Sequence, residues 1–322
     1  MAINEINGYA PIVLFTYNRL DHTKQTIEKL KNNYGAKQSN LYIISDGFKN
    51  HEDKEAVEQV RNYIDTTTGF KNIKIIKRKN NYGLGRNIIS GISHILKNYE
   101  SVIVLEDDII TSKFFLTYMN LALQKYKSEP KVMSISGYIS PIKKEGLDDY
   151  FFMPWFECWG WATWKDRWAY FERTPKRLIT NSEYSLIKRV NVNGSAPDLW
   201  NQVIDNYKNI KYTWAIFNHI SICKNEGLVL YPKYSLCKNI GFDGSGDNCD
   251  RSNDYDTTID EKKRSYSFPN EYMSSKLAIK RFEEFNNKRN KGIRNQIVLR
   301  SRIFVYYLYG KVFNYIHNSH WR

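Results

Sequence analysis

The sequence predicts an α/β protein with a mainly parallel sheet flanked by helices. In the first half of the chain, short apolar segments rich in β-branched residues alternate with segments whose apolar residues recur every three or four positions. This alternation is typical of β-α-β units. With 322 residues, of which 42% are hydrophobic and 25% charged, the chain is long and apolar enough to bury a large core.

Five apolar segments are predicted to form the strands of the first half, at residues 11–17, 41–45, 73–77, 102–105 and 132–136. Two of the segments between them have the periodicity of amphipathic helices. Leu20, Thr23, Ile27 and Leu30 share one helical face, and so do Ile88, Ile92, Ile95 and Leu96. We therefore expect helices after the first and third strands.

Polar residues follow each of the first four predicted strands. Asn18 and Arg19 follow the first strand, Asp46 and Gly47 the second, residues 80–87 the third, and Glu106, Asp107 and Asp108 the fourth. In open sheets of this kind, ligands bind beyond the carboxyl ends of the strands. We therefore expect these four clusters to converge on one ligand site.

The second half of the chain has a different composition. An aromatic segment covers residues 151–168, and a loop rich in Gly and Asp covers residues 239–248. We place a boundary near Pro141 and predict three parts: residues 1–140, residues 141–268, and a basic helical extension at 269–322. The extension is expected to hold a polar helix and then a basic amphipathic helix.

The three consecutive carboxylates of Glu106, Asp107 and Asp108 follow a buried strand and require a counter-ion. Oxygen ligands suit a hard divalent cation such as Mg²⁺ or Mn²⁺, which often bridges to substrate phosphates. If the strand continues through this cluster, Glu106 and Asp108 share a face and Asp107 points elsewhere. A solvated acidic turn that caps the next helix is the simpler alternative.

The segment 80–87 places Gly83, Gly85 and Arg86 at the start of a predicted helix. Backbone amides at such a helix start can approach a phosphate, and Arg86 adds a charge-assisted donor. Asp46 could accept a hydrogen bond from the ring N–H of a uracil. Each of these features is also explained by an ordinary turn or helix cap.

The sequences IVLFTYNR, ISDG, YGLGRN and VIVLEDDI occur in an order and spacing that resembles the GT-A nucleotide-sugar glycosyltransferases. The LEDD form followed by FF is similar to the N-acetylglucosaminyltransferase I group and to bacterial sugar transferases of surface-polysaccharide synthesis. The later segments CWGWATWKDRW and NIGFDGSG also look like those bacterial enzymes. The resemblance covers residues 11–249.

The resemblance implies a role for each matching residue. Asp108 would ligate a divalent ion, Mn²⁺ or Mg²⁺, that bridges the diphosphate of the donor, with Asp107 near the ribose and Glu106 supporting the site. Asp46 would face the uracil. The remaining nucleotide-binding residues would be Thr16, Tyr17, Asn18, Arg19 and Arg86.

The residue that would act as general base departs from the N-acetylglucosaminyltransferase I pattern, because Ala215 follows Trp214 where that group has an acidic residue. Inverting transfer needs a carboxylate within hydrogen-bond reach of the acceptor hydroxyl. Glu157, Asp243 and Asp247 are the candidates.

The eight tryptophans include five in the aromatic segment. Trp161, Trp164 and Trp168 are spaced like one buried helical stripe, and we expect them in the core. Trp155, Glu157 and Trp159, in the preceding loop, are favoured for substrate contact. His219 lies among apolar residues and is predicted to be a core histidine.

The net charge of +14 indicates an anionic partner. Eleven basic residues in the extension account for much of this charge: Lys276, Lys280, Arg281, Lys288, Arg289, Lys291, Arg294, Arg300, Arg302, Lys311 and Arg322. The extension either lies on an anionic membrane surface, which we favour, or packs on the catalytic domain with a solvated basic face. The four cysteines lack paired spacing, and no signal peptide or apolar run long enough to span a bilayer is visible. We therefore predict a cytoplasmic protein, peripheral on the inner face of the plasma membrane.

The predicted function is therefore a metal-dependent, inverting glycosyltransferase. It would move a sugar from a nucleoside diphosphate, most simply UDP, to a glycan or a lipid-linked oligosaccharide in capsule, O-antigen or related surface-polysaccharide synthesis. A nucleotidyltransferase that makes nucleotide sugars is an alternative, although the Gly-rich basic loop of such enzymes is absent after the first strand. A basic nucleic-acid-binding protein is another, but the usual modules are not visible and we expect no nucleic-acid partner.

Overall fold

The computed structural model describes residues 5–244, 253–289 and 301–313. Its strands are β1 (Ile12–Thr16), β2 (Asn40–Ser45), β3 (Asn72–Lys77), β4 (Ser101–Glu106), β5 (Ile109–Thr111), β6 (Val132–Ser136), β7 (Tyr150–Met153), β8 (Trp161–Trp164), β9 (Leu228–Pro232) and β10 (Cys237–Asn239). The strands predicted in the first half correspond to β1, β2, β3, β4 and β6. The apolar runs of β1, β4 and β6 are buried on both faces, as strands inside a covered sheet require, whereas β3 is the edge strand and its side chains are exposed or only partly buried.

The α-helices are α1 (Leu20–Lys31), α2 (His51–Asp65), α3 (Leu84–Ile95), α4 (Phe115–Lys125), α5 (Lys165–Trp168), α6 (Pro175–Asn181), α7 (Tyr184–Val190), α8 (Leu199–Tyr207), α9 (Ala215–Lys224) and α10 (Lys276–Arg289). Short 3₁₀ turns lie at Ala36–Gln38 and Val192–Gly194. Residues 301–313 are also helical and are called the C-terminal helix below. The helices predicted after β1 and β3 are α1 and α3.

One sheet contains eight strands in the order β3-β2-β1-β4-β8-β6-β9-β7. β1 pairs in parallel with β2 and β4, and β6 pairs in parallel with β9. Only β7 and β8 run antiparallel to their neighbours in this sheet. The carboxyl ends of β1 and β4 therefore lie side by side, with Phe15 opposite Glu106.

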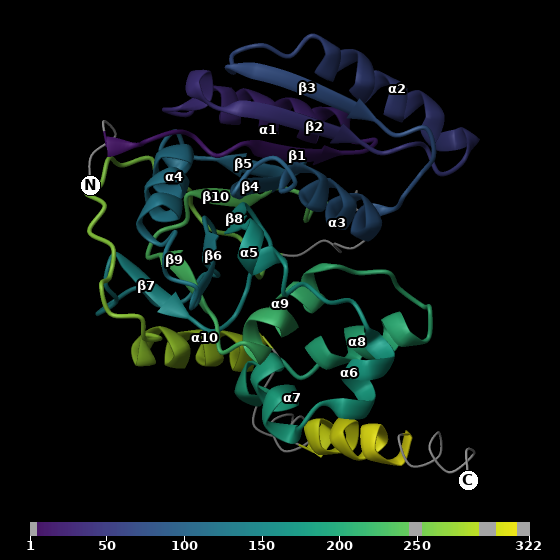
Figure 1. Ribbon diagram of the computed structural model, residues 1–322, viewed down its shortest axis with the longest axis vertical. Helices are drawn as coiled ribbons and strands as arrows, with labels where there is room; N and C mark the ends of the chain where they lie inside the picture. The colour runs from purple at the N-terminus through teal and green to yellow at the C-terminus, as the bar shows by residue number, and fades with distance from the viewer. Residues whose placement is uncertain (1–4, 245–252, 290–300, 314–322) are drawn as a thin grey trace.

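Successive side chains of a strand point to opposite faces of the sheet and therefore pack against different helices. Ile12 and Leu14 of β1 join a core cluster with residues of α1, α2 and α4. Val13 and Phe15 join the other cluster, which includes α3 and the helices of the second half. Figure 1 shows α1 and α2 at the top of the molecule, with α6, α7 and α8 at the far side of the sheet. This sheet covered on both faces confirms the predicted α/β fold class.

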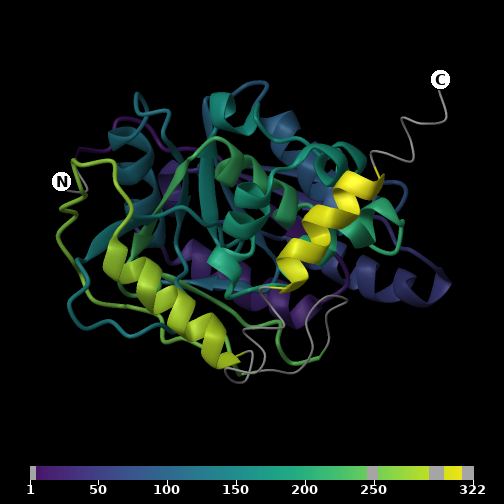
Figure 2. The same ribbon diagram turned by 90° about the horizontal axis from the view of Figure 1, so that it is seen from below.

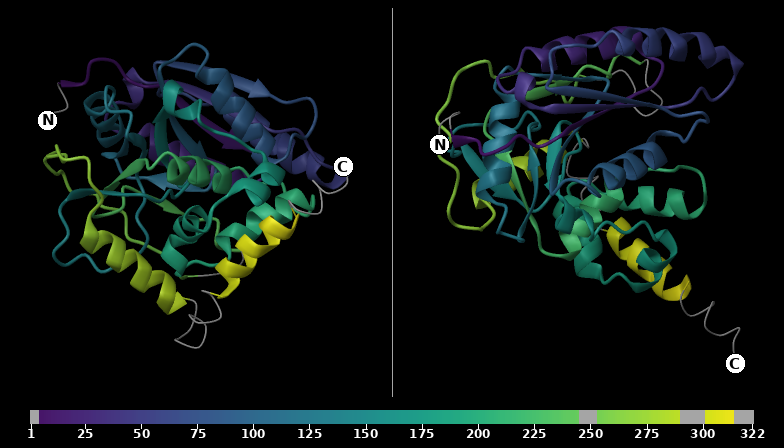
Figure 3. Two further views of the ribbon diagram at one scale, coloured as in Figure 1. Left: turned by 60° about the horizontal axis from the view of Figure 1, so that its bottom comes forward. Right: turned by 45° about the horizontal axis from the view of Figure 1, so that its top comes forward.

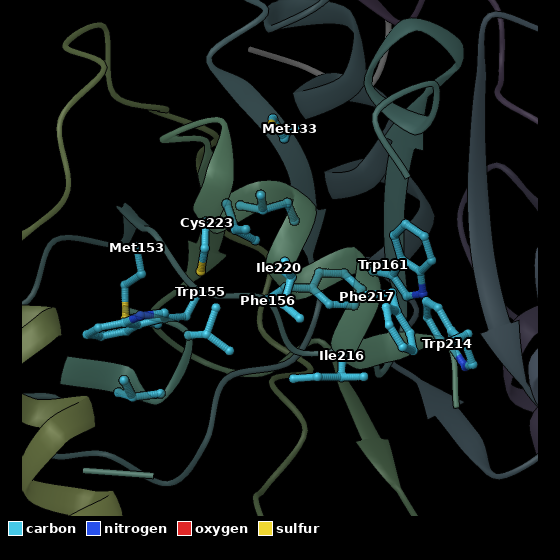
Figure 4. Packing of buried hydrophobic residues seen from close by; sticks show 14 of the residues in the cluster. Met133, Met153, Trp155, Phe156, Trp161, Trp214, Ile216, Phe217, Ile220 and Cys223 are labelled. Carbon is cyan, nitrogen blue, oxygen red and sulfur yellow. The ribbon is translucent and has the colours of Figure 1, made fainter. Parts of the chain in front are cut away.

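The aromatic segment of the second half enters the core as a strand, and the helical stripe predicted for it is wrong. Trp161 and Trp164 are 1% and 2% exposed and lie on β8, while Trp168 ends α5. Trp161 stacks on Trp214, with ring centroids 5.5 Å apart, beside Phe217 of α9 (Figure 4). The prediction that these tryptophans are core residues is correct, because β8 inserts between β4 and β6.

The two last helices lie on the side of the molecule opposite α1 and α2. Figure 2, seen from below, and the left panel of Figure 3 show α10 and the C-terminal helix on this side. Phe282 of α10 stacks on Trp155, with ring centroids 5.5 Å apart. Trp155 is 1% exposed, so the prediction that it contacts substrate is wrong. Its indole N–H donates to the carbonyl of Arg189 at 2.9 Å, which fixes it in the core.

Candidate active site

The acidic cluster forms a turn between β4 and β5 that we call the acid turn (Glu106, Asp107 and Asp108). β4 ends at Glu106, so the extended geometry that would separate Asp107 from Asp108 does not continue. Both aspartates instead contact the guanidinium of Arg19, Asp108 at 2.9 Å. The expectation that Asp107 points away from Asp108 is therefore wrong, because the strand ends one residue too early.

Arg19 reaches the acid turn because it caps the start of α1, directly after β1. Thr26 of the same helix donates a hydrogen bond to the carbonyl of Asp107 at 2.7 Å. Burial opposes the charge on Arg19, but the two carboxylates raise the pKa of its guanidinium above the ordinary value. Arg19 is therefore the counter-ion of Asp107 and Asp108 in the part of the chain that the structure describes.

A second, two-stranded sheet brings a distant loop over the acid turn. β5 pairs antiparallel with β10, and the amide of Ile240 donates to the carbonyl of Asp108 at 2.8 Å. Gly241 follows, and a Cβ at this position would overlap the Asp108 carboxylate and approach Arg19 to 3.0 Å. Only a residue without a side chain lets the backbone pass this close.

His22 and Asp243 meet at the edge of the acid turn. His22 Nε2 lies 3.3 Å from Asp243 Oδ2, and the Asp243 side chain is 48% exposed. Asp243 therefore reaches the site through the loop that carries Gly241. His22 was not among the predicted site residues, since one histidine inside an amphipathic helix carries no sequence signal. Asp247, another candidate base, lies outside the described residues.

Burial dominates the electrostatics of the acid turn. It raises the pKa of Glu106 to about 8, with the charges of Asp108 and Asp107 adding to the shift. It raises the pKa of Asp107 to about 6, opposed by the charge of Arg19. A polar site that is this desolvated favours the arrival of another cation.

Two buried oxygens at this edge of the sheet have no hydrogen-bond partner among the described residues. They are Oγ1 of Thr16, which is 3% exposed, and Oδ2 of Asp107, which is 4% exposed. Buried polar atoms are normally satisfied, so each unsatisfied one calls for an explanation. A ligand that enters between β1 and the acid turn would supply the missing partners.

Tyr17 and Asn18, which follow β1, contact the first turn of α2. The Tyr17 hydroxyl donates to Asp53 at 2.8 Å, and the Asn18 amide donates to the same carboxylate at 3.2 Å. The backbone amide of Asp53 donates to the side chain of Asn50, which caps the start of α2. Asp53 was missed from the sequence, where it reads as an ordinary acidic residue in the first turn of a helix.

Asp46 is buried and uses one oxygen to hold the Gly-containing turn. Its Oδ1 accepts hydrogen bonds from the amides of Gly47 and Tyr82, both at 2.9 Å. Burial raises its pKa, while these amides lower it. A Cβ on Gly47 would overlap the backbone of Asn80, so the Asp-Gly pair sets the position of the whole turn. Asp46 thus lies at the predicted edge of the sheet, where it holds the turn of Tyr82 and Gly83 in position.

Arg86 is exposed at the start of α3 and faces the second half of the chain. Its guanidinium lies 4.7 Å from the ring centroid of Tyr212, and Arg173 lies 3.5 Å from the same ring. Burial and the nearby charge of Arg86 lower the pKa of Arg173. The two arginines thus place positive charge beside the first turn of α3, and the described residues give neither of them an ion pair.

Glu157 lies in the loop between β7 and β8. Its carboxylate accepts hydrogen bonds from the hydroxyl of Ser140 and, at 3.3 Å, from the Ser140 amide. Burial raises the pKa of Glu157 to about 7, and Lys144 acts against this shift. Trp159, two residues on, packs edge-on against Phe242, with ring centroids 5.3 Å apart. Phe242 adjoins Gly241, so this pair connects the Glu157 loop to the acid turn.

The residues of the acid turn fit a divalent cation. All potential ligands there are carboxylate oxygens, which hard cations prefer, and Asp107 Oδ2 is unsatisfied. Within the described ranges, no group of three or more His, Cys, Asp or Glu side chains could hold a metal ion. A cation held here would take one or two carboxylates from the protein and further ligands from a substrate phosphate.

Comparison with known proteins assigns the first half of the chain. Residues 12–151 match the family model described as glycosyl transferase family 2. This range contains the acid turn, Arg19, Asp46 and Arg86, together with strands β1 to β6. No protein with curated annotation matches the chain.

Two solved structures have a remote likeness to this chain. The mannosyltransferase PcManGT from Pyrobaculum calidifontis, in complex with GDP-Man and Mn²⁺, has a TM-score of 0.39 and 11% identity, covering 67% of this chain and 70% of that chain. S. aureus TarS has a TM-score of 0.30 and 14% identity, covering 44% of this chain and 24% of TarS. At these scores neither structure assigns a ligand to this chain.

The family match and the sheet with its acid turn define the class of the protein. Residues 12–151 form a glycosyl transferase family 2 domain of the GT-A type of α/β fold. The protein is a glycosyltransferase.

Proposed function

We propose that this glycosyltransferase transfers a sugar, with inversion, from a uridine diphosphate donor to a hydroxyl of a glycan in surface-polysaccharide synthesis. The acid turn supports this most strongly, because it sets Asp107 and Asp108 beside Arg19 and leaves buried oxygens unsatisfied. The finer resemblance to the N-acetylglucosaminyltransferase I group and its bacterial relatives supports the donor and the pathway.

The donor diphosphate would lie over the carboxyl ends of β1 and β4. Arg19 stands there as a ready guanidinium donor for a phosphate oxygen, and the Thr16 hydroxyl is close to the same edge. Asp46 holds the turn that carries Tyr82 and Gly83 in place. These residues would bind and orient the nucleotide.

Asp108, with Asp107 beside it, would hold a Mn²⁺ or Mg²⁺ ion. When bound, such an ion neutralises the charge that develops on the departing nucleoside diphosphate. Arg19 contacts the same carboxylate oxygens and would exchange part of that contact for the donor phosphate. The chain thus supplies an internal cation that keeps the two aspartates together before the donor arrives.

The general base is proposed to be Asp243. Its carboxylate is half exposed and sits two residues from Gly241, which lies against Asp108. His22 lies 3.3 Å from it and would orient the carboxylate toward the acceptor hydroxyl. Glu157 is the second candidate, since its raised pKa of about 7 suits a proton acceptor, but Ser140 already occupies both of its oxygens.

A thermal-shift screen tests the donor. UDP and UDP-sugars with Mn²⁺ are expected to raise the melting temperature by roughly 4 °C or more at saturating concentration, while Mn²⁺ alone or GDP-sugars have less effect. Stabilisation by GDP-sugars and not by UDP-sugars would overturn the choice of uridine. No stabilisation by any nucleotide, with strong salt-dependent retention on DNA, would favour a nucleic-acid binder.

Single replacements test the base. Asp243→Asn is expected to lower kcat at least a hundredfold while donor binding in the thermal-shift assay is unchanged. Glu157→Gln and Asp247→Asn are the comparison variants. A large loss of kcat in one of these two, with Asp243→Asn near wild type, would move the base to that residue.

A further inference from the structure

The C-terminal helix carries a row of large apolar side chains on its outer face. Phe304, Val305, Leu308, Tyr309 and Val312 are 52%, 57%, 44%, 38% and 56% exposed, and we call them the apolar ridge. Residues four apart on a helix lie on one face, so Phe304, Leu308 and Val312 form one row and Val305 and Tyr309 the next. No described part of the chain covers this ridge.

The opposite face of the same helix is docked firmly, which fixes the ridge toward the outside. Ile303 and Tyr306 are 1% and 8% exposed, and the Tyr306 hydroxyl donates to Asn201 of α8 at 2.9 Å. A Cβ at Gly310 would overlap the carbonyl of Ile179 in α6, so the helix backbone lies directly on that helix. The inner face of this helix therefore packs against α6 and α8, and the apolar ridge is on the face that remains exposed.

Basic residues border the ridge. Arg302 and Lys311 lie at its two edges, where they pair with Asp198 at 2.8 Å and Glu183 at 3.1 Å. The sequence from residue 285 to residue 322 contains eight Lys and Arg residues and no Asp or Glu. This end of the protein is therefore both apolar and strongly cationic.

Helix α10 adds a second cationic surface on the same side of the molecule. Its exposed positions recur every four residues and carry Lys276, Lys280, Glu284 and Lys288. Figures 2 and 3 show α10 and the C-terminal helix together on the side away from α1 and α2. The side of the molecule that carries the apolar ridge therefore also carries three exposed lysines on one face of α10.

We propose that this side of the protein, formed by α10 and the C-terminal helix, binds the surface of an anionic lipid bilayer. The apolar ridge would enter the boundary between headgroups and acyl chains, and the lysines of α10 would lie over lipid phosphates. Apolar residues on one helix face with flanking Lys and Arg are what such interfacial binding requires. No described helix is long and apolar enough to cross a membrane.

Charge favours a lipid surface over a second copy of this chain. Two copies that met through this side would bring like charges together, which costs free energy, whereas anionic headgroups complement them. Nucleic acid would also complement the charge but gives no reason for five exposed apolar side chains on one helix face. The proposal is independent of the donor, the metal and the base proposed above.

Vesicle flotation with the full chain tests the proposal. Vesicles of phosphatidylcholine alone are compared with vesicles that also contain phosphatidylglycerol, at low and at high salt. The protein is expected to float with the anionic vesicles, and its bound fraction is expected to fall as salt rises. The triple variant Phe304→Ser, Leu308→Ser, Val312→Ser is expected to weaken this partitioning at least tenfold.

Two further variants make the result specific. Tyr34→Ser, Tyr170→Ser and Ile210→Ser together remove three apolar side chains of similar exposure elsewhere and are expected to leave flotation unchanged. Lys276→Gln, Lys280→Gln and Lys288→Gln together are expected to reduce the preference for anionic vesicles. Full binding by the lysine variant would refute the cationic surface even if the ridge variant fails to fold.

Three results would overturn the proposal. The wild-type chain could ignore anionic vesicles, or the ridge variant could float as well as wild type. In the third, sedimentation would show that wild type is a dimer and the ridge variant a monomer, with no vesicle binding by either. That last result would assign the ridge to a second copy of the chain.

Discussion

The acid turn and the surroundings of His219 both bury ionisable side chains, but they differ in how many hydrogen bonds are completed. His219 Nδ1 accepts from the amide of Phe156 at 3.2 Å, and its Nε2–H donates to the carbonyl of Val190 at 3.0 Å. Burial lowers its pKa to about 4, so the ring is neutral at physiological pH. The prediction that His219 is a satisfied core histidine is correct.

The hydrogen bonds of the acid turn are not completed in this way. Asp107 and Asp108 share Arg19, and Oδ2 of Asp107 has no partner in the described part of the chain. Burial raises the pKa of Asp107 to about 6, which marks the cost of holding its charge there. A buried polar group that completes its own hydrogen bonds serves the fold, whereas one that leaves acceptors open points to a ligand.

The strongest test of this contrast is Asp108→Asn. It keeps the shape of the side chain but removes the charge that would bind the cation and is expected to lower kcat by about 10³-fold. The melting temperature should stay within a few degrees of wild type, since a like-charge contact is lost together with one ion pair. Donor hydrolysis and transfer assays measure the effect. Full activity in this variant would refute the metal assignment.

Removal of Arg19 tests whether the aspartates depend on an internal cation. Arg19→Met leaves Asp107 and Asp108 without a counter-ion, and the free energy of unfolding in the absence of divalent ions is expected to fall by about 3 kcal/mol. Addition of Mn²⁺ should recover part of this loss, which urea unfolding would measure.

The matched control is Arg177→Met, because Arg177 forms an exposed ion pair with Glu172 at 3.1 Å. Its effect is expected to be below about 1 kcal/mol. If Arg19→Met is as stable as this control, with or without Mn²⁺, Arg19 does not hold the acid turn together.

His219 predicts a pH dependence of stability with a defined sign. Its pKa in the folded protein, about 4, is below the ordinary value of 6.5, so the unfolded chain binds the extra proton first as pH falls. The stability from the neutral ring is present above pH 6.5 and is expected to fall by about 2 kcal/mol by pH 5. His219→Phe should lack this component of the pH dependence. Identical pH profiles of urea unfolding for the two proteins would contradict the prediction.

Apart from the control Arg177→Met, Gly241→Ala is expected to have the smallest effect. The new methyl group would displace the Asp108 carboxylate while it leaves the core intact. We expect about tenfold weaker binding of UDP with Mn²⁺, close to 1.4 kcal/mol, measured by calorimetry. Unchanged affinity would show that the loop after β10 stands clear of the ligand.

Much of the first half could be predicted because its signals are local. A run of β-branched residues such as 102–105 indicates a strand wherever it packs, and α1 and α3 show their apolar periodicity in a dozen residues each. The second half could not be predicted in this way. Trp161, Trp164 and Trp168 have helical spacing, yet β8 forms because β4 and β6 leave an antiparallel place between them.

The candidate site shows the same division. Asp108 follows a strand and is visible in the sequence, and so is Asp46. His22, Gly241 and Asp53 are not visible, since each matters only through a residue far along the chain. Asp243 was a candidate only through its Gly-rich loop, and the pairing of β5 with β10 places that loop at the acid turn.

The sequence by itself determined the α/β class, the position of the acid turn at a strand end and the cationic character of the last helices. These depend on the order of apolar, polar and charged residues along short stretches. Only the tertiary structure decided that Arg19 holds the two aspartates, that Gly241 lies against Asp108, and that the apolar ridge faces outward. Such contacts join residues tens to hundreds of positions apart, and chain packing, which local composition does not encode, brings them together.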